Sequence, residues 1–201
     1  MDQSLVDWVV AHRTAWLDHL AFALKAIGQS IVSFLAVVVT TAVVTFRRRQ
    51  WAWGLAVTYA AVGALVASAV GKAAIRRPRP PRSLALLDAD GWAMPSSVAL
   101  LCAALGVAVI AGWDGRGRPH RWWSVAIVVA TAALFGWAVV YLGAHWPGDV
   151  LVGWAVGIVV GAVAVAVSRP TADWVQGRWP ERFPDPGREL GSDAVGHAQE
   201  A

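Results

Sequence analysis

The feature that most constrains this chain is a series of apolar runs, each close to the length of a bilayer crossing and each bounded by charged or Pro- and Gly-rich segments. The run from Trp51 to Gly71 is long enough to cross a membrane as a helix and ends at a basic cluster. We therefore expect an all-α, polytopic membrane helix bundle with about five transmembrane helices. The other four are expected at 31–46, 96–113, 122–142 and 149–167.

The composition agrees with a membrane protein and excludes several other classes. Hydrophobic residues make up 57% of the 201 residues and charged residues only 15%, which is too apolar for a water-soluble domain of this size. The net charge of +4 does not indicate nucleic-acid binding, because the basic residues lie in short clusters beside the apolar runs. Cys102 is the single cysteine, so there is no internal disulfide and no thiolate metal site.

The chain divides into three expected parts. Residues 1–29 have apolar positions at helical spacing but also many ionisable groups, so we expect an amphipathic helix at the membrane interface. Residues 30–168 form the transmembrane domain. Residues 169–201 are rich in Pro, Gly and charge without apolar periodicity and are expected to be a disordered polar tail. Within the last span, the series Gly153, Gly157 and Gly161 permits close helix approach.

Counting the crossings places three polar segments on one membrane face: the loop after Lys72, the turn at 94–98 and the turn at 143–149. Seven basic residues are expected on the opposite face (Arg47, Arg48, Arg49, Arg116, Arg118, Arg121 and Arg169), against five on the first (Lys72, Arg76, Arg77, Arg79 and Arg82). By the positive-inside rule the opposite face is cytoplasmic. The sequence thus predicts an integral protein of the cell membrane with the three segments on its outer face.

The first polar segment, Lys72 to Pro80, allows two interpretations. Its positive charges suit a membrane anchor or a patch that attracts anionic lipid head groups. Alternatively, Pro78 and Pro80 stiffen the backbone and hold guanidinium groups in fixed directions, as an anion pocket for phosphate requires.

The second polar segment, Pro95-Ser96-Ser97, opens an apolar run. The free backbone amides of a helix N-terminus and two hydroxyls make a natural site for phosphate oxygens. Serines at this place are also ordinary N-caps, and taken alone the segment favours that interpretation.

The third polar segment contains His145 and Asp149, four residues apart. At this spacing the carboxylate can bind one ring nitrogen and leave the other directed at a pocket, which fixes the tautomer and raises its nucleophilicity. The alternative is an interfacial His with Asp149 as an acidic residue in the first turn of a helix that follows Pro147.

Taken in order, the three segments resemble the type 2 phosphatidic acid phosphatase family, the membrane relatives of vanadium haloperoxidases. The resemblance lies in Lys72-x6-Arg79-Pro80, then Pro95-Ser96, then Tyr141-Leu-Gly-Ala-His145-Trp-Pro-Gly-Asp149, and it covers roughly residues 15 to 168. The family usually has six spans, whereas five are found here, which indicates an absent amino-terminal span or a misassigned start.

The resemblance implies a phosphatase that acts on lipid phosphates or diphosphates without a metal or other cofactor. His145 would attack phosphorus and form a phosphohistidine, and Asp149 would orient it. The phosphoryl group would be bound by Lys72, Arg79, Ser96 and the amide of Ser97. The expected partners are the lipid substrate and the surrounding membrane lipids.

Two positions depart from the family pattern. The second motif is normally Pro-Ser-Gly-His, whose His protonates the leaving group, and this chain has Val98 there. The third motif normally carries Arg six residues before the nucleophilic His, and this chain has Val139. Losing a general acid costs about 10² to 10⁴ in rate. The full decrease in rate applies when the leaving group is an alkoxide. The phosphate that leaves from a diphosphate is a weaker base and needs less protonation. The sequence therefore favours prenyl or lipid diphosphates as substrates.

Two hypotheses of different classes remain. One is an impaired or substrate-restricted lipid phosphatase, favoured by His145 and its partners; the other is a catalytically inactive relative that binds anionic lipid or a membrane partner, favoured by Val98 and Val139. A transporter or channel is less consistent with the sequence, because the expected spans lack the charged residues that would line a path for ions or polar solutes. Asp88 or Asp90 is a further hypothesis for the missing proton donor.

Overall fold

The computed structural model describes residues 2–112 and 118–179, and this part of the chain is entirely helical apart from its loops and turns. The α-helices are α1 (Asp2–Ala11), α2 (Ala15–Gln29), α3 (Ile31–Arg48), α4 (Trp51–Ile75), α5 (Ser97–Gly112), α6 (Arg118–Tyr141) and α7 (Pro147–Arg178), with a short 3-10 helix η1 at Arg82–Leu84. The expected all-α bundle is confirmed for these residues.

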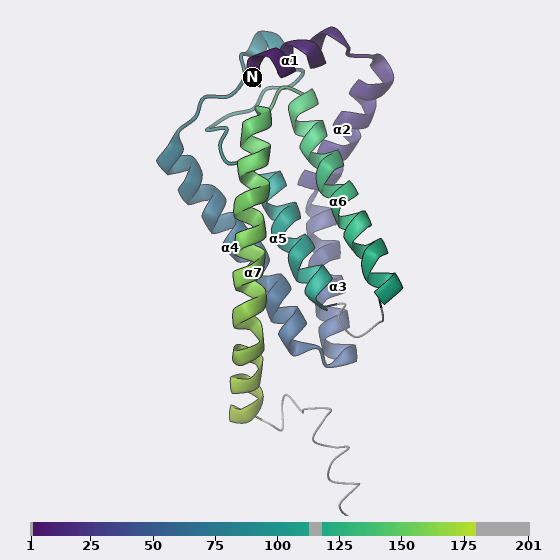
Figure 1. Ribbon diagram of the computed structural model, residues 1–201, viewed down its shortest axis with the longest axis vertical. Coiled ribbons are helices and arrows are strands. Elements are labelled where there is room, and N and C mark those ends of the chain that lie inside the picture. Colours follow the sequence, from purple (N-terminus) through teal and green to yellow (C-terminus); the bar gives the residue numbers. More distant parts are fainter. Residues whose placement is uncertain (1, 113–117, 180–201) are drawn as a thin grey trace, which may run out of the picture.

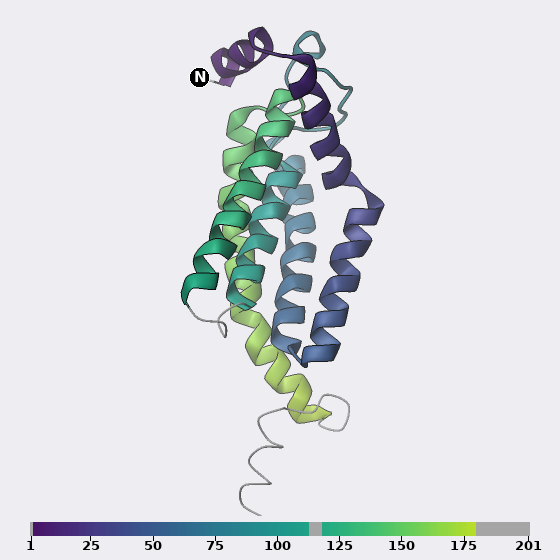
Figure 2. The same cartoon turned by 90° about the vertical axis from the view of Figure 1, so that its right-hand side faces the viewer.

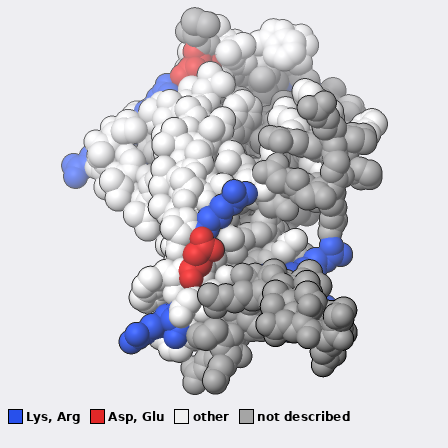
Figure 3. Space-filling view, turned by 60° about the horizontal axis from the view of Figure 1, so that its bottom comes forward, with Lys and Arg blue, Asp and Glu red and all other residues white. Residues whose placement is uncertain are grey.

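Three of the helices are long and apolar enough to cross a membrane: α4, the part of α6 from Trp122 to Tyr141, and α7. Helix α5 is apolar but shorter over Ser97–Ala111. The side of the molecule seen in Figure 3 is uncharged over broad areas of the described residues, and its charged side chains occur in a few separate groups. These features identify an integral membrane protein.

Helices α4, α5 and α7 form the centre of the bundle, and glycines allow α7 to lie directly against α5 (Figure 1). A Cβ added at Gly153, Gly157 or Gly161 would lie 2.8, 2.4 or 2.7 Å from backbone carbonyl oxygens of α5 and the residue before it. Only glycine fits such a contact, because the obstacle is backbone. The packing role expected for this glycine series is confirmed.

The N-terminal region consists of two helices, so the single amphipathic helix expected for residues 1–29 is wrong. Helix α1 lies across one end of the bundle, and α2 turns down beside α6 (Figures 1 and 2). The break falls at 12–14, where the guanidinium of Arg13 donates hydrogen bonds to the backbone oxygens of Leu84 and Tyr141 at 2.8 and 2.7 Å. Both carbonyls lie far from Arg13 in the sequence. The pattern of residues 1–29 alone therefore could not predict these hydrogen bonds or the break between the two helices.

Helix α3 stands to one side of the central helices (Figure 2). It packs on α4 and α2, and an apolar groove of about 650 Å³ opens between it and α4, α5 and α6. Val37, Leu65, Leu105 and Phe135 are among the residues that line this groove. Its walls suit hydrocarbon chains rather than polar groups.

Helix α7 continues to Arg178, so the expected disordered tail is wrong for residues 169–178; residues 180–201 lie outside the described residues. The helix passes through Pro170, which has no backbone N–H to donate. Nearby hydroxyls bind carbonyl oxygens in this part of the helix: Ser168 donates to Val165 at 2.9 Å and Thr171 donates to Val167 at 2.7 Å. Both bonds go to carbonyls next to that of Ala166, which is the carbonyl that an N–H at position 170 would bind.

The three polar segments meet at the end of the bundle crossed by α1. They are the C-terminal end of α4 with the loop that follows it, the start of α5, and the turn between α6 and α7 (Figure 1). Asp149 joins them, because its backbone oxygen accepts the N–H of Ser96 and its carboxylate accepts a hydrogen bond from Arg77. The prediction that the three segments share one face is confirmed by these contacts.

Candidate active site

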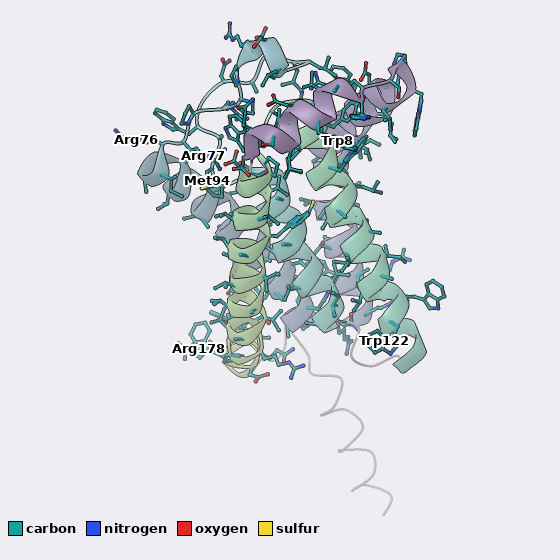
Figure 4. The ribbon with its side chains drawn as sticks, turned by 45° about the horizontal axis from the view of Figure 1, so that its top comes forward. Trp8, Arg76, Arg77, Met94, Trp122 and Arg178 are labelled. Atoms are coloured by element: carbon teal, nitrogen blue, oxygen red, sulfur yellow. The ribbon has the colours of Figure 1, made fainter. Side chains whose placement is uncertain are left out.

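The end of α4 determines which arginines turn inward. Arg76 caps the helix in the left-handed conformation (φ 49°, ψ 39°), and its side chain points away from the bundle (Figure 4). Beyond it the exposure alternates: Arg77 and Arg79 are half-buried, whereas Pro78 between them is exposed. Arg77 lies beside the upper end of α7, near Met94 (Figure 4). Two of the basic side chains therefore reach the interior.

Arg79 is fixed by backbone oxygens and lies against the ring of His145. Its Nη1 donates to the oxygen of Ala144 at 2.6 Å, and its Nε is 3.1 and 3.2 Å from the oxygens of Asp90 and Gly91. The same Nη1 lies 3.4 Å from Nε2 of His145. A guanidinium held by carbonyls in this way retains free N–H groups for an anion beside the imidazole.

The turn that carries His145 is held by the last residues of α6. The oxygen of Val139 accepts the N–H groups of Ala144 and His145 at 3.0 and 3.2 Å. Gly143 reverses the chain at φ 74°, and a Cβ there would lie 2.6 Å from Cα of Ala85. The glycine is required twice, for its backbone angle and for this close approach.

The imidazole of His145 is 6% exposed, and its two nitrogens face different groups. Nδ1 lies 3.5 Å from Oδ2 of Asp149 and makes no hydrogen bond within the described residues. Burial lowers the pKa of His145; the Asp149 carboxylate opposes this shift, and the charges of Arg79 and Lys72 add to it. Because the pKa lies below 6.5, the neutral form of the ring predominates at pH 7.

Asp149 is fully buried in the first turn of α7, and both of its oxygens are bound. Oδ2 accepts the backbone N–H of Trp146 at 2.9 Å, and Oδ1 accepts Nη1 of Arg77 at 2.9 Å. The expected position in the first helical turn is observed, and Oδ2 also faces Nδ1 of His145 at 3.5 Å without a hydrogen bond.

Arg77 was missed as a site residue by sequence reasoning. Besides Asp149, it binds Oδ2 of Asp2 in α1 through Nη2 at 2.6 Å. Burial opposes the charge on Arg77, but the two carboxylates outweigh it and raise its pKa. The only signal in the sequence was its place in the basic cluster, which does not distinguish it from its neighbours.

Lys72 is half-buried in the last turn of α4. Its Nζ donates to the backbone oxygen of Trp92 at 2.8 Å, which directs the ammonium group across the loop that follows α4. Lys72 thus binds the same loop as Arg79, which donates to the backbone oxygens of Asp90 and Gly91.

The two serines at the start of α5 have different surroundings. Ser96 is fully buried, its Oγ has no hydrogen-bond partner within the described residues, and its N–H donates to the backbone oxygen of Asp149 at 3.0 Å. The hydroxyl of Ser97 instead pairs with that of Ser68 at 2.7 Å. A buried hydroxyl without a partner is costly, so Ser96 has an unused capacity to bind a phosphate oxygen.

Val98 and Val139, the two departures from the family pattern, belong to one apolar cluster that also contains Ala99, Ala144 and Val150. Neither alternative proton donor is buried: Asp88 is exposed and lies 3.4 Å from Nε of the exposed Arg82, and Asp90 is exposed as well. Side chains that form metal sites do not gather here either, since no group of three or more His, Cys, Asp or Glu residues occurs among the described residues. The described residues thus bring the guanidinium groups of Arg77 and Arg79 and the imidazole of His145 together around Asp149.

Comparisons with known proteins agree with this arrangement. The family model of the PAP2 superfamily matches residues 51–172, more than half of the chain. No curated protein matches the sequence. Among solved structures, a transmembrane PAP2-type phosphatidylglycerolphosphate phosphatase from Bacillus subtilis is similar, with 24% identity, a TM-score of 0.72, and coverage of 84% of this chain and 85% of that one. LpxE from Aquifex aeolicus is also similar, with 22% identity, a TM-score of 0.63, and coverage of 82% and 94%.

Proposed function

Because this chain belongs to the PAP2 superfamily, we propose that it is a membrane phosphatase that hydrolyses a lipid phosphate, with a preference for a prenyl or lipid diphosphate. The family and the membrane fold are shown; the substrate, the intermediate and the roles of individual residues are our proposal. The observation that carries it is the position of His145, with Nε2 against Arg79 and Nδ1 toward a buried carboxylate.

In the proposed reaction Nε2 of His145 attacks phosphorus, and the bond between phosphorus and the leaving oxygen breaks. The lone pair of Nε2 is available because the ring is neutral, and Asp149 stabilises the positive charge that develops on the ring. Lys72 and Arg79 neutralise the phosphoryl oxygens, and Ser96 Oγ donates a hydrogen bond to one of them. Water then attacks the phosphohistidine, which releases inorganic phosphate and restores the imidazole.

The preference for a diphosphate follows from the apolar cluster around Val98. Valine cannot protonate a leaving oxygen, so the departing group must be a weak base. The terminal phosphate of a diphosphate leaves behind a phosphate monoester, which meets this condition, whereas a phosphatidate leaves behind an alkoxide. Phosphatidylglycerolphosphate, named for the Bacillus subtilis neighbour, belongs to the less favoured group as a phosphate monoester.

A catalytically inactive lipid-binding protein is the second candidate function. It is favoured by the way Val139 fills its position, since this residue is only 5% exposed and packs with other apolar side chains. Such a protein retains the anion pocket of Lys72 and Arg79 and binds a lipid phosphate without releasing it.

Purified full-length protein in detergent distinguishes the two candidates. Phosphate release is measured with farnesyl diphosphate, a phosphatidate and phosphatidylglycerolphosphate, for wild type, His145→Ala and the control His19→Ala, which changes an exposed histidine. Release from the diphosphate that is lost in His145→Ala and kept in His19→Ala supports the enzyme. An inert wild type, together with activity gained only by Val98→His with Val139→Arg, supports the inactive relative.

We also propose that the site lies on the outer face of the cell membrane, which rests on the excess of basic residues in the segments expected on the opposite face. The test is the labelling of single cysteines in intact cells by a membrane-impermeant maleimide, with Cys102 replaced. A cysteine at exposed Ser83 beside the site should react, and one at exposed Gln50 at the opposite end should not.

A further inference from the structure

Arg77 binds the oxygen of Asp149 that His145 does not use. Its Nη1 is 2.9 Å from Oδ1, whereas the ring nitrogen of His145 faces Oδ2. The backbone N–H of Trp146 also binds Oδ2. With one oxygen held by a guanidinium and the other by a backbone amide, the carboxylate cannot rotate without breaking a charge-assisted hydrogen bond.

The guanidinium is itself held by the N-terminal helix. Nη2 of Arg77 donates to Oδ2 of Asp2 at 2.6 Å, and the guanidinium carbon lies 5.7 Å from the centre of a Trp146 ring. The contact lies directly over Gly148, where a Cβ would come within 2.9 Å of Oδ2 of Asp2 and 3.1 Å of Nη1 of Arg77. A residue larger than glycine at 148 would displace these groups.

The position of Arg77 also excludes it as a ligand of the phosphoryl group in this arrangement. The reacting nitrogen, Nε2, faces Arg79, and Arg77 lies behind the carboxylate on the Nδ1 side of the ring. Two of its nitrogens already donate to carboxylates.

We propose that Arg77 is a positioning residue that holds Asp149 in the orientation required by His145, and that Asp2 of α1 completes this clamp. The clamp consists of the side chains of Asp2, Arg77 and Asp149. The inference deepens the proposed phosphatase function and rests on it, because the orientation of His145 matters for attack on phosphorus.

The physical need for the clamp comes from the burial of Asp149. A buried carboxylate requires a partner, and a rigid guanidinium fork can satisfy two carboxylates at once in fixed directions. A lysine at position 77 keeps the charge, but its ammonium group cannot donate to two carboxylates in fixed directions. Because Arg77 shares the negative charge of Asp149, less of that charge acts on His145, which also faces the cations of Arg79 and Lys72.

The first test measures the pKa and the tautomer of the His145 imidazole by NMR, so it does not depend on turnover. The full chain is labelled with ¹³C and ¹⁵N histidine in detergent, and the His145 signal is assigned by its loss in His145→Gln. In Arg77→Gln the pKa of His145 should rise, because the charge of Asp149 is no longer shared, and the ratio of the two tautomers should change, because the carboxylate is no longer held in one orientation. The matched control is Arg76→Gln, the same change at the exposed neighbouring arginine, which should leave both unchanged. An unchanged His145 signal in Arg77→Gln overturns the proposal.

The part played by α1 is tested with Asp2→Asn and its control, Asp7→Asn. Asp7 lies on the same helix, is exposed, and accepts a hydrogen bond from Gln3. Without Asp2, the charge of Arg77 acts undivided on Asp149, so the pKa of His145 should fall, and Asp7→Asn should not move it. Equal effects of the two substitutions exclude Asp2 from the clamp.

Kinetics with farnesyl diphosphate complete the test. A misplaced nucleophile should lower kcat by about 10²-fold in Arg77→Gln, with KM within about threefold of wild type because substrate binding is retained. Arg77→Lys should also lose turnover, since it has no fork. A raised KM with kcat unchanged would make Arg77 a phosphate ligand and overturn the clamp.

The outcomes separate the clamp from the phosphatase proposal. A wild-type chain that releases no phosphate but shows the expected histidine shifts refutes the phosphatase and leaves the clamp standing. If the wild type is active but Arg77→Gln changes neither turnover nor the His145 signal, the phosphatase proposal is supported and the clamp is refuted. Thermal unfolding checks each variant, and if Arg77→Gln does not fold, Arg77→Lys and Asp2→Asn decide, because both keep a cation beside Asp149.

Discussion

Val98 and Val139 come from different helices and pack into the same apolar cluster beside His145. The two departures from the family pattern are thus neighbours in space. An arginine at 139 would have lain against this cluster, and a histidine at 98 would have bordered it. Replacing both by valine makes one continuous apolar wall where the family has polar groups.

The first prediction concerns this wall. Val98→His should raise the turnover of a phosphatidate by about 10²-fold or more, because it restores a general acid where an alkoxide must leave. The turnover of farnesyl diphosphate should change by less than about tenfold, since its leaving group is a weaker base. Phosphate release from both substrates is measured in parallel. Equal gains with the two would show that leaving-group protonation does not limit the wild-type protein.

The single variant Val139→Arg tests the apolar packing around Val139. Val139 is only 5% exposed and lies among apolar side chains, so an arginine there is an uncompensated buried charge. We expect it to cost about 3 kcal/mol or more of stability, whereas Val98→His, at a half-buried position, should cost less. Thermal unfolding in detergent compares the two, and a Val139→Arg variant as stable as wild type would contradict the apolar packing around Val139.

The second prediction concerns pH. Burial lowers the pKa of His145 from its ordinary value of 6.5, so the acidic limb of kcat/KM should have its midpoint below that value. The unfolded chain takes up this proton near pH 6.5, while the folded protein does so only at lower pH. The free energy of unfolding should therefore fall as pH drops below about 6.5 and level off beneath the folded pKa.

His145→Gln removes this contribution, and His19→Gln is its control at an exposed position. The difference in unfolding free energy between wild type and His145→Gln, measured from pH 5 to pH 8, should depend on pH in the acidic part of the range. A difference that is constant with pH would mean that the His145 pKa is not lowered in the folded protein.

The sequence could propose candidate site residues because they lie in short segments with fixed spacing. Lys72, Arg79 and His145 were each found from local patterns, and the number of crossings between them brought them to one face. Arg77 could not be selected in this way. Four arginines lie between 76 and 82, and nothing in their local pattern distinguishes the half-buried Arg77 from the exposed Arg76 and Arg82.

Contacts between distant segments explain the other differences. The break between α1 and α2 depends on Arg13 and on two carbonyls far along the chain, and the pairing of Asp2 with Arg77 depends on that break. Neither has a periodic or compositional signal. The continuation of α7 to Arg178 was missed because the stretch from 169 onward is rich in Pro, Gly and charge and has no apolar periodicity.

The third prediction uses the unpartnered hydroxyl of Ser96. Ser96→Ala removes a buried polar atom without a partner among the described residues, so it should leave the unfolding temperature unchanged or raise it. It should also raise KM for farnesyl diphosphate by up to about tenfold, the value of one hydrogen bond. Ser97→Ala is the control: it strands the hydroxyl of Ser68 and should lower stability with little effect on KM. Reversed effects of the two would assign the phosphate contact to Ser97.

The fourth prediction links the helix packing to the site. Gly157→Ala would place a Cβ 2.4 Å from the backbone oxygen of Leu100, which cannot move without shifting α5, and should cost about 1–3 kcal/mol. Gly177→Ala, on the same helix with nothing within 4 Å, should instead stabilise by about 0.5 kcal/mol through helix propensity. Because α5 begins at Ser97 and the N–H of Ser96 binds the oxygen of Asp149, the shift in α5 should also lower kcat for farnesyl diphosphate. Thermal unfolding and phosphate release on the same samples test both effects, and a Gly157→Ala variant as stable and active as Gly177→Ala would mean that the contact between α5 and α7 does not position the site.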